Sequence, residues 1–197
     1  SGSGRRLAAA PVRARRRMSR REHHRLPLAG SWLHLALDLP EQPRAALVIA
    51  PALFHEAPRS HRLFSLLADA LAALQVAVLR LDYRGCGDSG GADADFLPSR
   101  AIEDCRQAAD FLRARTGQPP TLLGVRGGAL IAAALAESLP FWAWQPVADG
   151  ASLLAELDAR ERFELGYRLR FPFLGQVPQA DPAVLMGQRL HPDFRLE

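Results

Sequence analysis

Short apolar runs alternate with longer amphipathic runs over residues 30–148, and this alternation constrains the fold more than any other feature of the chain. The apolar runs predict strands over residues 31–38, 45–50, 76–82, 121–123 and 141–145. Helical spacing between them predicts helices over residues 60–74, 98–116 and 128–138, with Ser60 as an N-cap and Gly117 just past a helix end. Such alternation predicts an α/β fold, with a mostly parallel sheet and helices on both faces.

The C-terminal part, residues 149–197, departs from this pattern. Residues 151–170 predict a charged amphipathic helix, after which repeated prolines and glycines interrupt regular structure, and we expect no further strand there. The body of the protein, residues 26–197, therefore divides into a sheet core of residues 30–148 and a cap-like or irregular C-terminal part.

Positive charge is concentrated at the N-terminus. The chain carries a net charge of +4, but residues 1–25 hold nine arginines and one acid, Glu22, so the remainder is net acidic. Such a segment can contact nucleic acid or anionic lipid, yet this one has no interleaved aromatic residues and no nucleic-acid-binding motif. We therefore interpret residues 1–25 as a basic, disordered head, with the native start near Met18, and expect no nucleic-acid partner.

The remaining composition narrows the class of protein. No apolar run approaches the roughly 20 residues of a membrane span, and the head lacks the apolar stretch of a secretory signal. Cys86 and Cys105 fit free thiols in a reducing cytoplasm better than a disulfide framework or a metal-ligand pair. The glycines of residues 85–91 lack the lysine of a P-loop. We therefore expect a cytoplasmic protein with no cofactor and no metal.

Residues 120–131, PTLLGVRGGALI, have the layout of a nucleophile elbow, the sharp strand-to-helix turn that normally presents a catalytic serine. Gly124 and Gly128 lie two positions either side of the apex, where larger side chains would collide with the turn, and Gly127 adds freedom. The apex is Arg126. A guanidinium stays protonated and has no lone pair with which to attack. The sequence therefore predicts the scaffold of a hydrolase without its nucleophile.

A second motif, LDYRGCGDSGG at residues 81–91, resembles the D-x-R-G-x-G-x-S turn of the α/β-hydrolase superfamily. The matching positions are Asp82, Arg84, Gly85, Gly87 and Ser89. The resemblance implies that this segment, including Asp88, shapes a turn beside the active site without supplying catalytic groups. Cys86 and Ser89 have no evident base partner, so we interpret both as turn residues and not as replacement nucleophiles.

Within the superfamily, the chain is similar to the exosortase A system-associated hydrolase-like proteins of bacteria and to their relatives beside polyketide clusters. Many of these carry arginine at the elbow apex. The similarity rests on four separate segments: residues 54–60, 124–132, 142–150 and 153–157. It implies an accessory role in exopolysaccharide or secondary-metabolite assembly.

The chain departs from the catalytic pattern of the superfamily, in which the nucleophile is followed by an acid and then a histidine. Gln145 stands where some relatives have an aspartate after the next strand. His191 is the only histidine after the elbow, and we interpret it as a surface residue. The chain also stops before the strands that normally carry acid and base. We therefore expect an incomplete fold, either a fragment or a naturally shortened member.

An arginine at the start of a helix lies against the positive end of the helix dipole and needs an anion nearby. One candidate is internal: Glu56, with Phe54, lies in the loop that should face the elbow, and a bidentate Arg126–Glu56 pair would plug the site. The other is an external anionic acyl or phosphopantetheine-type ligand at the helix N-terminus. We favour the internal pair, because an unpaired buried arginine is costly.

These observations leave three functions open. The leading one is a non-catalytic or very weak hydrolase homologue. The second is an active ester or thioester hydrolase with an unidentified nucleophile. The third is an interaction module, whose open sheet edge and apolar surface are covered by a partner or a second copy of the chain. The sequence identifies neither a substrate nor an oligomeric state.

Overall fold

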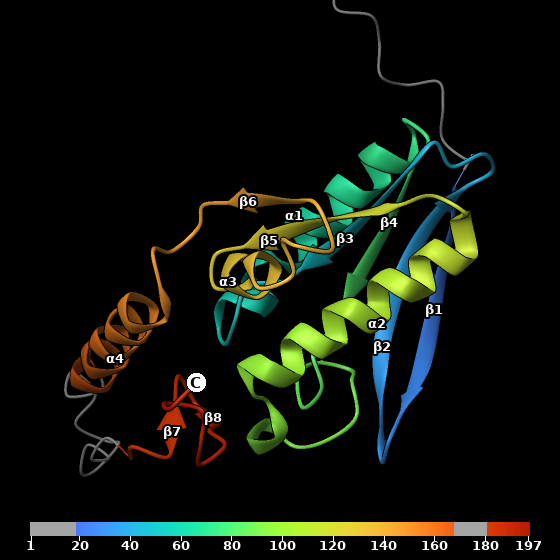
Figure 1. Ribbon diagram of the computed structural model, residues 1–197. Coiled ribbons are helices and arrows are strands. Elements are labelled where there is room, and N and C mark those ends of the chain that lie inside the picture. The colour runs from blue at the N-terminus through green and yellow to red at the C-terminus, as the bar shows by residue number, and fades with distance from the viewer. Residues whose placement is uncertain (1–18, 168–180) are drawn as a thin grey trace, which may run out of the picture.

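The computed structural model describes residues 19–167 and 181–197 (Figure 1). A six-stranded sheet has the order β1-β2-β4-β3-β5-β6. β3 pairs in parallel with β4 and β5, and β5 pairs in parallel with β6, whereas β1 and β2 form an antiparallel edge. The strands are β1 (Ser19–Leu28), β2 (Ser31–Pro40), β3 (Ala45–Ala50), β4 (Val76–Leu81), β5 (Pro120–Val125) and β6 (Phe141–Trp144).

Helices cover both faces of this sheet (Figure 1). α1 (Glu56–Ala72) packs on one face, where Phe64 and Ala68 bury alternate residues of β3 and β4. α2 (Pro98–Thr116) and α3 (Gly128–Ala133) pack on the other face, against the larger apolar cluster. The mostly parallel α/β architecture expected from the sequence is confirmed. It places the ends of β3, β4 and β5 side by side, since parallel strands share their carboxyl edge.

The C-terminal elements pack beside this core. α4 (Gly150–Tyr167) buries Leu153 and Leu157, and a short hairpin follows, made of β7 (Val184–Leu185) and β8 (Gln188–Arg189). Phe194 packs edge-on against Phe54, which anchors the C-terminal segment beside the loop between β3 and α1. A 3-10 turn, η1 (Asp93–Asp95), lies between β4 and α2.

The basic head is shorter than the sequence suggested. Residues 1–18 lie outside the described residues, but residues 19–25 form most of β1, so the prediction of disorder is wrong for them. β1 is an edge strand with mostly exposed side chains, so it lacks the apolar alternation that reveals a strand. Polar contacts hold it instead: Arg21 Nε donates to Asp38 at 2.7 Å, and Arg115 Nη2 donates to Glu22 at 2.8 Å.

Three other local predictions need correction. α1 begins at Glu56, so Ser60 is not an N-cap; its hydroxyl donates to the Glu56 carbonyl at 2.8 Å, one turn back. Pro58 lies in the first turn of α1, where proline is tolerated. α3 ends at Ala133 and gives way to turns. The C-terminal part also contains a hairpin, whose two-residue strands are too short to leave a periodic signal.

Other boundaries agree with the sequence. β3 and α2 have the predicted limits, and Gly117 adopts φ 68° at the end of α2, where it donates to the Arg113 carbonyl. The end of the helix predicted over residues 151–170 falls in part outside the described residues. No described helix combines the length and apolar character that crossing a membrane would require.

Candidate functional site

The turn between β5 and α3 has the geometry of an elbow. Arg126, between the last residue of β5 and the start of α3, has φ 51°, in the left-handed region that non-glycine residues rarely occupy. Its backbone is tied on both sides: its N–H donates to the Trp144 carbonyl at 3.0 Å, and its carbonyl accepts from the Ala129 N–H at 3.0 Å. The surrounding structure thus holds a strained residue at the apex.

The flanking glycines are required by close packing. A Cβ on Gly124 would lie 2.5 Å from the Cα of Ala129, in the first turn of α3. A Cβ on Gly128 would collide with the carbonyl oxygens of Ala50 and Pro51, at the end of β3. At the elbow, α3 therefore lies so close to β5 and β3 that no side chain fits at positions 124 and 128.

The Arg126 guanidinium is held by two carboxylates from different helices. Its Nε donates to Oε1 of Glu56 at 3.1 Å, and its Nη2 donates to Oε1 of Glu156 at 2.6 Å. The expected contact with Glu56 is present, but it is not bidentate, because α4 supplies a second acceptor. The hydrogen bond that Arg126 donates to Glu156, together with the one it donates to Glu56, outweighs desolvation and raises the Arg126 pKa.

Aliphatic side chains cover the residue next to the apex. A Cβ on Gly127 would lie 2.8 Å from Leu153 of α4 and 3.0 Å from Leu53 of the β3–α1 loop. In a nucleophile elbow, the N–H of this residue and an N–H from the loop after β3 form the oxyanion hole. α4 therefore packs against the residue after the apex with Leu153, while Glu156 binds the arginine beside it.

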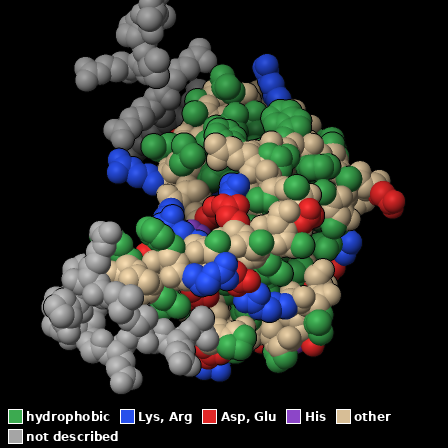
Figure 2. All heavy atoms as spheres, turned by 90° about the vertical axis from the view of Figure 1, so that its left-hand side faces the viewer, with side chains coloured by type: hydrophobic (Ala, Val, Ile, Leu, Met, Phe, Trp, Pro, Cys, Tyr) green, Lys and Arg blue, Asp and Glu red, His purple; other side chains and the backbone are tan. Residues whose placement is uncertain are grey.

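A groove of about 650 Å³ lies beside Arg126, on the face shown in Figure 2. It is lined by α1, α4 and the end of β6, with Glu56, Glu156, Arg59 and Arg160 among its charged residues. His55 also lines it; desolvation, followed by the charge of Arg59, lowers the His55 pKa, so the imidazole is neutral at pH 7. The groove contains charged side chains of both signs. Among the described residues that line it, no serine hydrogen-bonds a histidine side chain.

Phe54 lies in the β3–α1 loop, at φ 54°, and is buried. Its ring packs against Phe96 and Phe194 with centroids 6.2 and 5.4 Å apart. It therefore holds the loop in place through an aromatic cluster, and it also lines a second cavity.

The turn after β4 forms as a separate structural unit. The Arg84 backbone N–H donates to Asp104 of α2 at 2.9 Å, and its Nη2 donates to the same carboxylate at 2.6 Å. Asp104 is almost completely buried, and desolvation raises its pKa in spite of Arg84. Gly85 has φ 79°, beside the Ala92 carbonyl. Arg84 and Gly85 thus anchor the turn to α2 and serve its shape.

The other candidate nucleophiles are poorly suited to attack. Burial, then the charge of Asp93, raises the pKa of the Cys86 thiol to about 12, so it stays protonated. The Ser89 hydroxyl donates to the Asp82 carbonyl at 2.6 Å and accepts from the His34 N–H at 2.8 Å. Cys86 and Cys105 are free thiols, as expected.

Gln145 and His191, which were compared with the acid and the histidine of a catalytic triad, make local contacts. Gln145 lies just past β6 at φ 47° and lines the groove beside Arg126. His191 is half-buried and accepts a hydrogen bond from the Asp193 N–H at 3.1 Å.

The structure therefore divides the predicted residues into two groups. Residues of the elbow meet Glu56, whereas Asp82 and Asp88 line the second cavity, which neither Arg126 nor Gly127 lines. Two participants were missed. Glu156, which binds Arg126, lies in a charged helix with no distinguishing motif. His34, which lies beside Asp82 and Asp88, belongs to a strand whose alternating pattern indicated only a structural role.

Comparison with known proteins agrees with this architecture. The model of a protein family described as "Serine aminopeptidase, S33" matches residues 41–148, which span β3 to the end of β6. No curated protein matches the chain.

Two solved structures, one from Agrobacterium vitis and one from Penicillium, share the fold. A protein from Agrobacterium vitis described as a hydrolase is 24% identical, with a TM-score of 0.55, over 91% of this chain and 72% of that one. The α/β hydrolase GrgF from Penicillium is 17% identical, with a TM-score of 0.58, over 86% of this chain and 62% of that one. Est1E from Butyrivibrio proteoclasticus, solved with ferulic acid, is 21% identical over 59% of this chain, with a TM-score of 0.48, and the chain spans 49% of its length.

Proposed function

The chain belongs to the serine aminopeptidase S33 family of α/β hydrolases, and from this premise we propose that it is a non-catalytic or very weak member of that family. The observation that carries the proposal is the Arg126 side chain, held by Glu56 and Glu156 at the apex where an acyl-enzyme would otherwise form. A guanidinium cannot act as a nucleophile. Leu153 packs against Gly127, the residue after the apex, and adds to the contacts of α4 with the elbow.

The catalytic claim can be tested with a fluorophosphonate probe and with short-chain p-nitrophenyl esters and acyl thioesters. We expect no stoichiometric labelling and no turnover above that of an Arg126→Met variant. Labelling of the wild-type protein would contradict the proposal and support the alternative, an active ester or thioester hydrolase. Mass spectrometry of the labelled peptide would then identify its nucleophile.

For the biological role, we propose an accessory part in exopolysaccharide or secondary-metabolite biosynthesis. The support is the similarity of the elbow and its flanking segments to the exosortase A system-associated proteins. Deletion of the gene in its host should lower the amount of polysaccharide or metabolite, and the wild-type gene should restore it. Unchanged product in the deletion strain would contradict this role.

An anionic acyl or phosphopantetheine-type ligand remains a second proposal for the groove beside Arg126. Arg59 and Arg160 line the same groove; Arg160 is paired with Glu164 within α4, so Arg59 is the cation that would assist Arg126 in binding an anion. Such a ligand would displace a carboxylate from Arg126. Calorimetric titration with phosphopantetheine would test the idea, and an affinity that is unchanged in Arg126→Ala would contradict it.

The edge of the sheet supports an interaction role, either alone or with the other functions. β6 has β5 as its neighbour in the sheet, and Trp142 and Trp144 are 68% and 40% exposed. We propose that a second copy of the chain covers this edge, since exposed strands and apolar surface favour association. Light scattering should then give a dimer that Trp142→Ser weakens, whereas a monomer at all concentrations would contradict it.

A further inference from the structure

A second cavity also borders the β3–α1 loop. It has a volume of about 430 Å³ and lies between α1, β2 and the turn after β4. Three of its lining residues, His34, Asp82 and Asp88, carry groups that bind metal ions. The elbow does not use these groups, and the turn motif accounts for the Asp82 side chain but not for those of His34 and Asp88.

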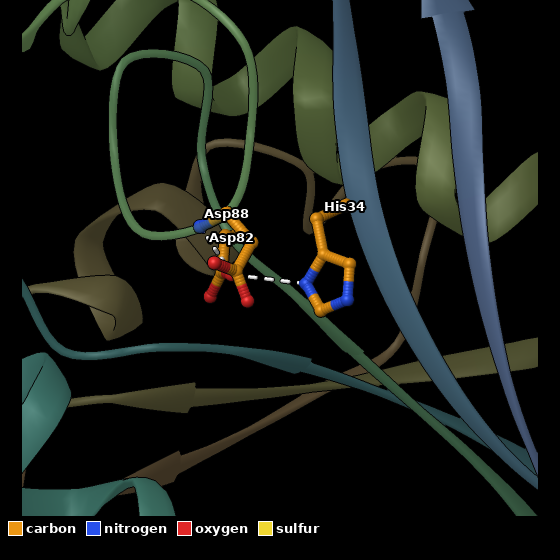
Figure 3. A group of neighbouring side chains, drawn as sticks. All are labelled: His34, Asp82 and Asp88. Atoms are coloured by element: carbon orange, nitrogen blue, oxygen red, sulfur yellow. Dashed lines mark hydrogen bonds and ion pairs between the residues drawn. The ribbon is translucent and has the colours of Figure 1, made fainter.

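The three side chains converge from different segments of the chain. His34 projects from β2, Asp82 follows the end of β4, and Asp88 lies in the loop beyond, with both carboxylates beside the imidazole (Figure 3). Their candidate ligand atoms all lie within 4.8 Å of one another, and His34 Nδ1 is 3.0 Å from Asp82 Oδ2. Ligand atoms about 2.0–2.2 Å from a tetrahedral zinc ion lie roughly 3.3–3.6 Å apart, so a pair near the upper limit would draw together on binding.

Backbone contacts fix the three residues relative to one another. The Ser89 hydroxyl bridges the His34 N–H and the Asp82 carbonyl, at 2.8 and 2.6 Å. The Asp88 N–H donates to Asp82 Oδ2 at 3.1 Å, and the Trp32 indole donates to the Asp88 carbonyl at 3.3 Å. The cluster is therefore held by rigid neighbours, which favours ion binding because little order must be imposed on the ligands.

His34 also has the partner that a metal-binding histidine requires. Its Nε2 lies 3.1 Å from Nδ1 of His23 on β1, and the two rings stack with centroids 5.3 Å apart. A histidine that ligates a metal through one ring nitrogen usually donates the other N–H to an acceptor. When His34 binds an ion through Nδ1, its Nε2–H would donate to Nδ1 of His23, and the ion would replace the hydrogen that Nδ1 shares with Asp82.

We propose that His34, Asp82 and Asp88 form a binding site for a divalent transition metal, of which zinc is the first to test. Imidazole together with carboxylates suits zinc, whereas calcium and magnesium favour oxygen ligands throughout. Three protein ligands leave a coordination position for water or for an oxygen of a small ligand. A bound ion would also compensate the two neighbouring carboxylates and join β2 to the turn after β4.

The test is calorimetric titration of untagged, EDTA-dialysed protein with Zn²⁺, and separately with Mg²⁺. We expect one saturable Zn²⁺ site, weakened more than about tenfold in both His34→Gln and Asp88→Asn, because each removes a ligand. His23→Ala should weaken binding by about tenfold through the second nitrogen of His34. Asp93→Asn, an exposed acid of the same loop, is the matched control and should bind like wild type.

Asp88 is exposed, so its asparagine variant should fold, and circular dichroism should verify this for each variant. Cobalt(II) substitution gives a second readout, since ligation by His34 should produce visible absorption that His34→Gln loses. The absence of saturable Zn²⁺ binding would overturn the proposal. So would equal affinity in wild type, His34→Gln and Asp88→Asn, which would assign the ion to other surface histidines, and so would a preference for Mg²⁺.

Discussion

Nη2 of Arg126 lies 2.6 Å from Oε1 of Glu156, and this contact joins the elbow to α4. Glu56 of α1 binds the same guanidinium from the other side. One arginine therefore connects two helices that flank the position of the missing nucleophile. The arrangement leads to predictions about stability as well as about activity.

Arg126→Met should loosen α4. The variant keeps most of the aliphatic stem but loses both ion pairs, and because Glu156 is largely exposed we expect a loss of only about 1 kcal/mol in the free energy of unfolding. Hydrogen exchange should nevertheless rise across residues 150–167. Arg160→Met, which breaks an exposed pair with Glu164 within α4, is the matched control. Equal exchange in the two variants would contradict a connecting role for Arg126.

Gly128→Ala should be severely destabilising. The new methyl group would collide with backbone carbonyls at the end of β3, which cannot move without disturbing the sheet, so we expect a loss of about 3 kcal/mol or more. Gly166→Ala is a control with open space around it, and should be neutral or stabilise by up to about 1 kcal/mol. Urea unfolding measures both values. A mild effect at residue 128 would mean that α3 packs less closely than described.

Both cysteines should resist alkylation in the folded protein. Burial raises the pKa of Cys86 and of Cys105 to about 12, against an ordinary value of 9.0. The thiolate fraction at pH 7.5 should therefore fall roughly a thousandfold. Mass spectrometry should find slow reaction with iodoacetamide in buffer and rapid reaction in denaturant. Fast labelling of Cys86 in the native state would reopen it as a nucleophile.

The contact between Asp158 and Arg195 should make the attachment of the C-terminal segment depend on pH. The hydrogen bonds from Arg195, at 2.9 and 3.1 Å, lower the Asp158 pKa from 3.8. The stabilisation is therefore present above pH 3.8 and is lost as the pH falls through the lower, folded value. Hydrogen exchange of residues 181–197 should rise in that acidic window.

Asp158→Asn should raise hydrogen exchange of residues 181–197 already at pH 7. The expected loss of protection corresponds to about 1 kcal/mol or less, as is usual for partly exposed ion pairs. Asp110→Asn, which removes an exposed partner of Arg113 in α2, provides a control that should leave the segment unchanged. Identical exchange in the two variants would show that Phe194 and its aromatic neighbours hold the segment without the ion pair.

The local sequence pattern was sufficient to predict a helix or strand wherever that element buries a regular apolar face. The apolar run of β3 and the helical spacing of α2 gave correct boundaries, and the glycines around Arg126 indicated the elbow. β1 was missed because an exposed edge strand has no such pattern, and its order comes from pairing with β2. Ser60 misled because its hydroxyl can bond either to a helix start or to the carbonyl one turn back.

The sequence by itself determined the α/β fold and the presence of a permanent cation at the elbow apex, because both depend on residues close together in the chain. The contact with Glu56 followed from the strand order. Only the tertiary structure decided that Glu156 would share Arg126 and that His34 would meet Asp82 and Asp88. Those encounters join residues far apart in the sequence, and the packing of separate elements sets their distances, which no local period records.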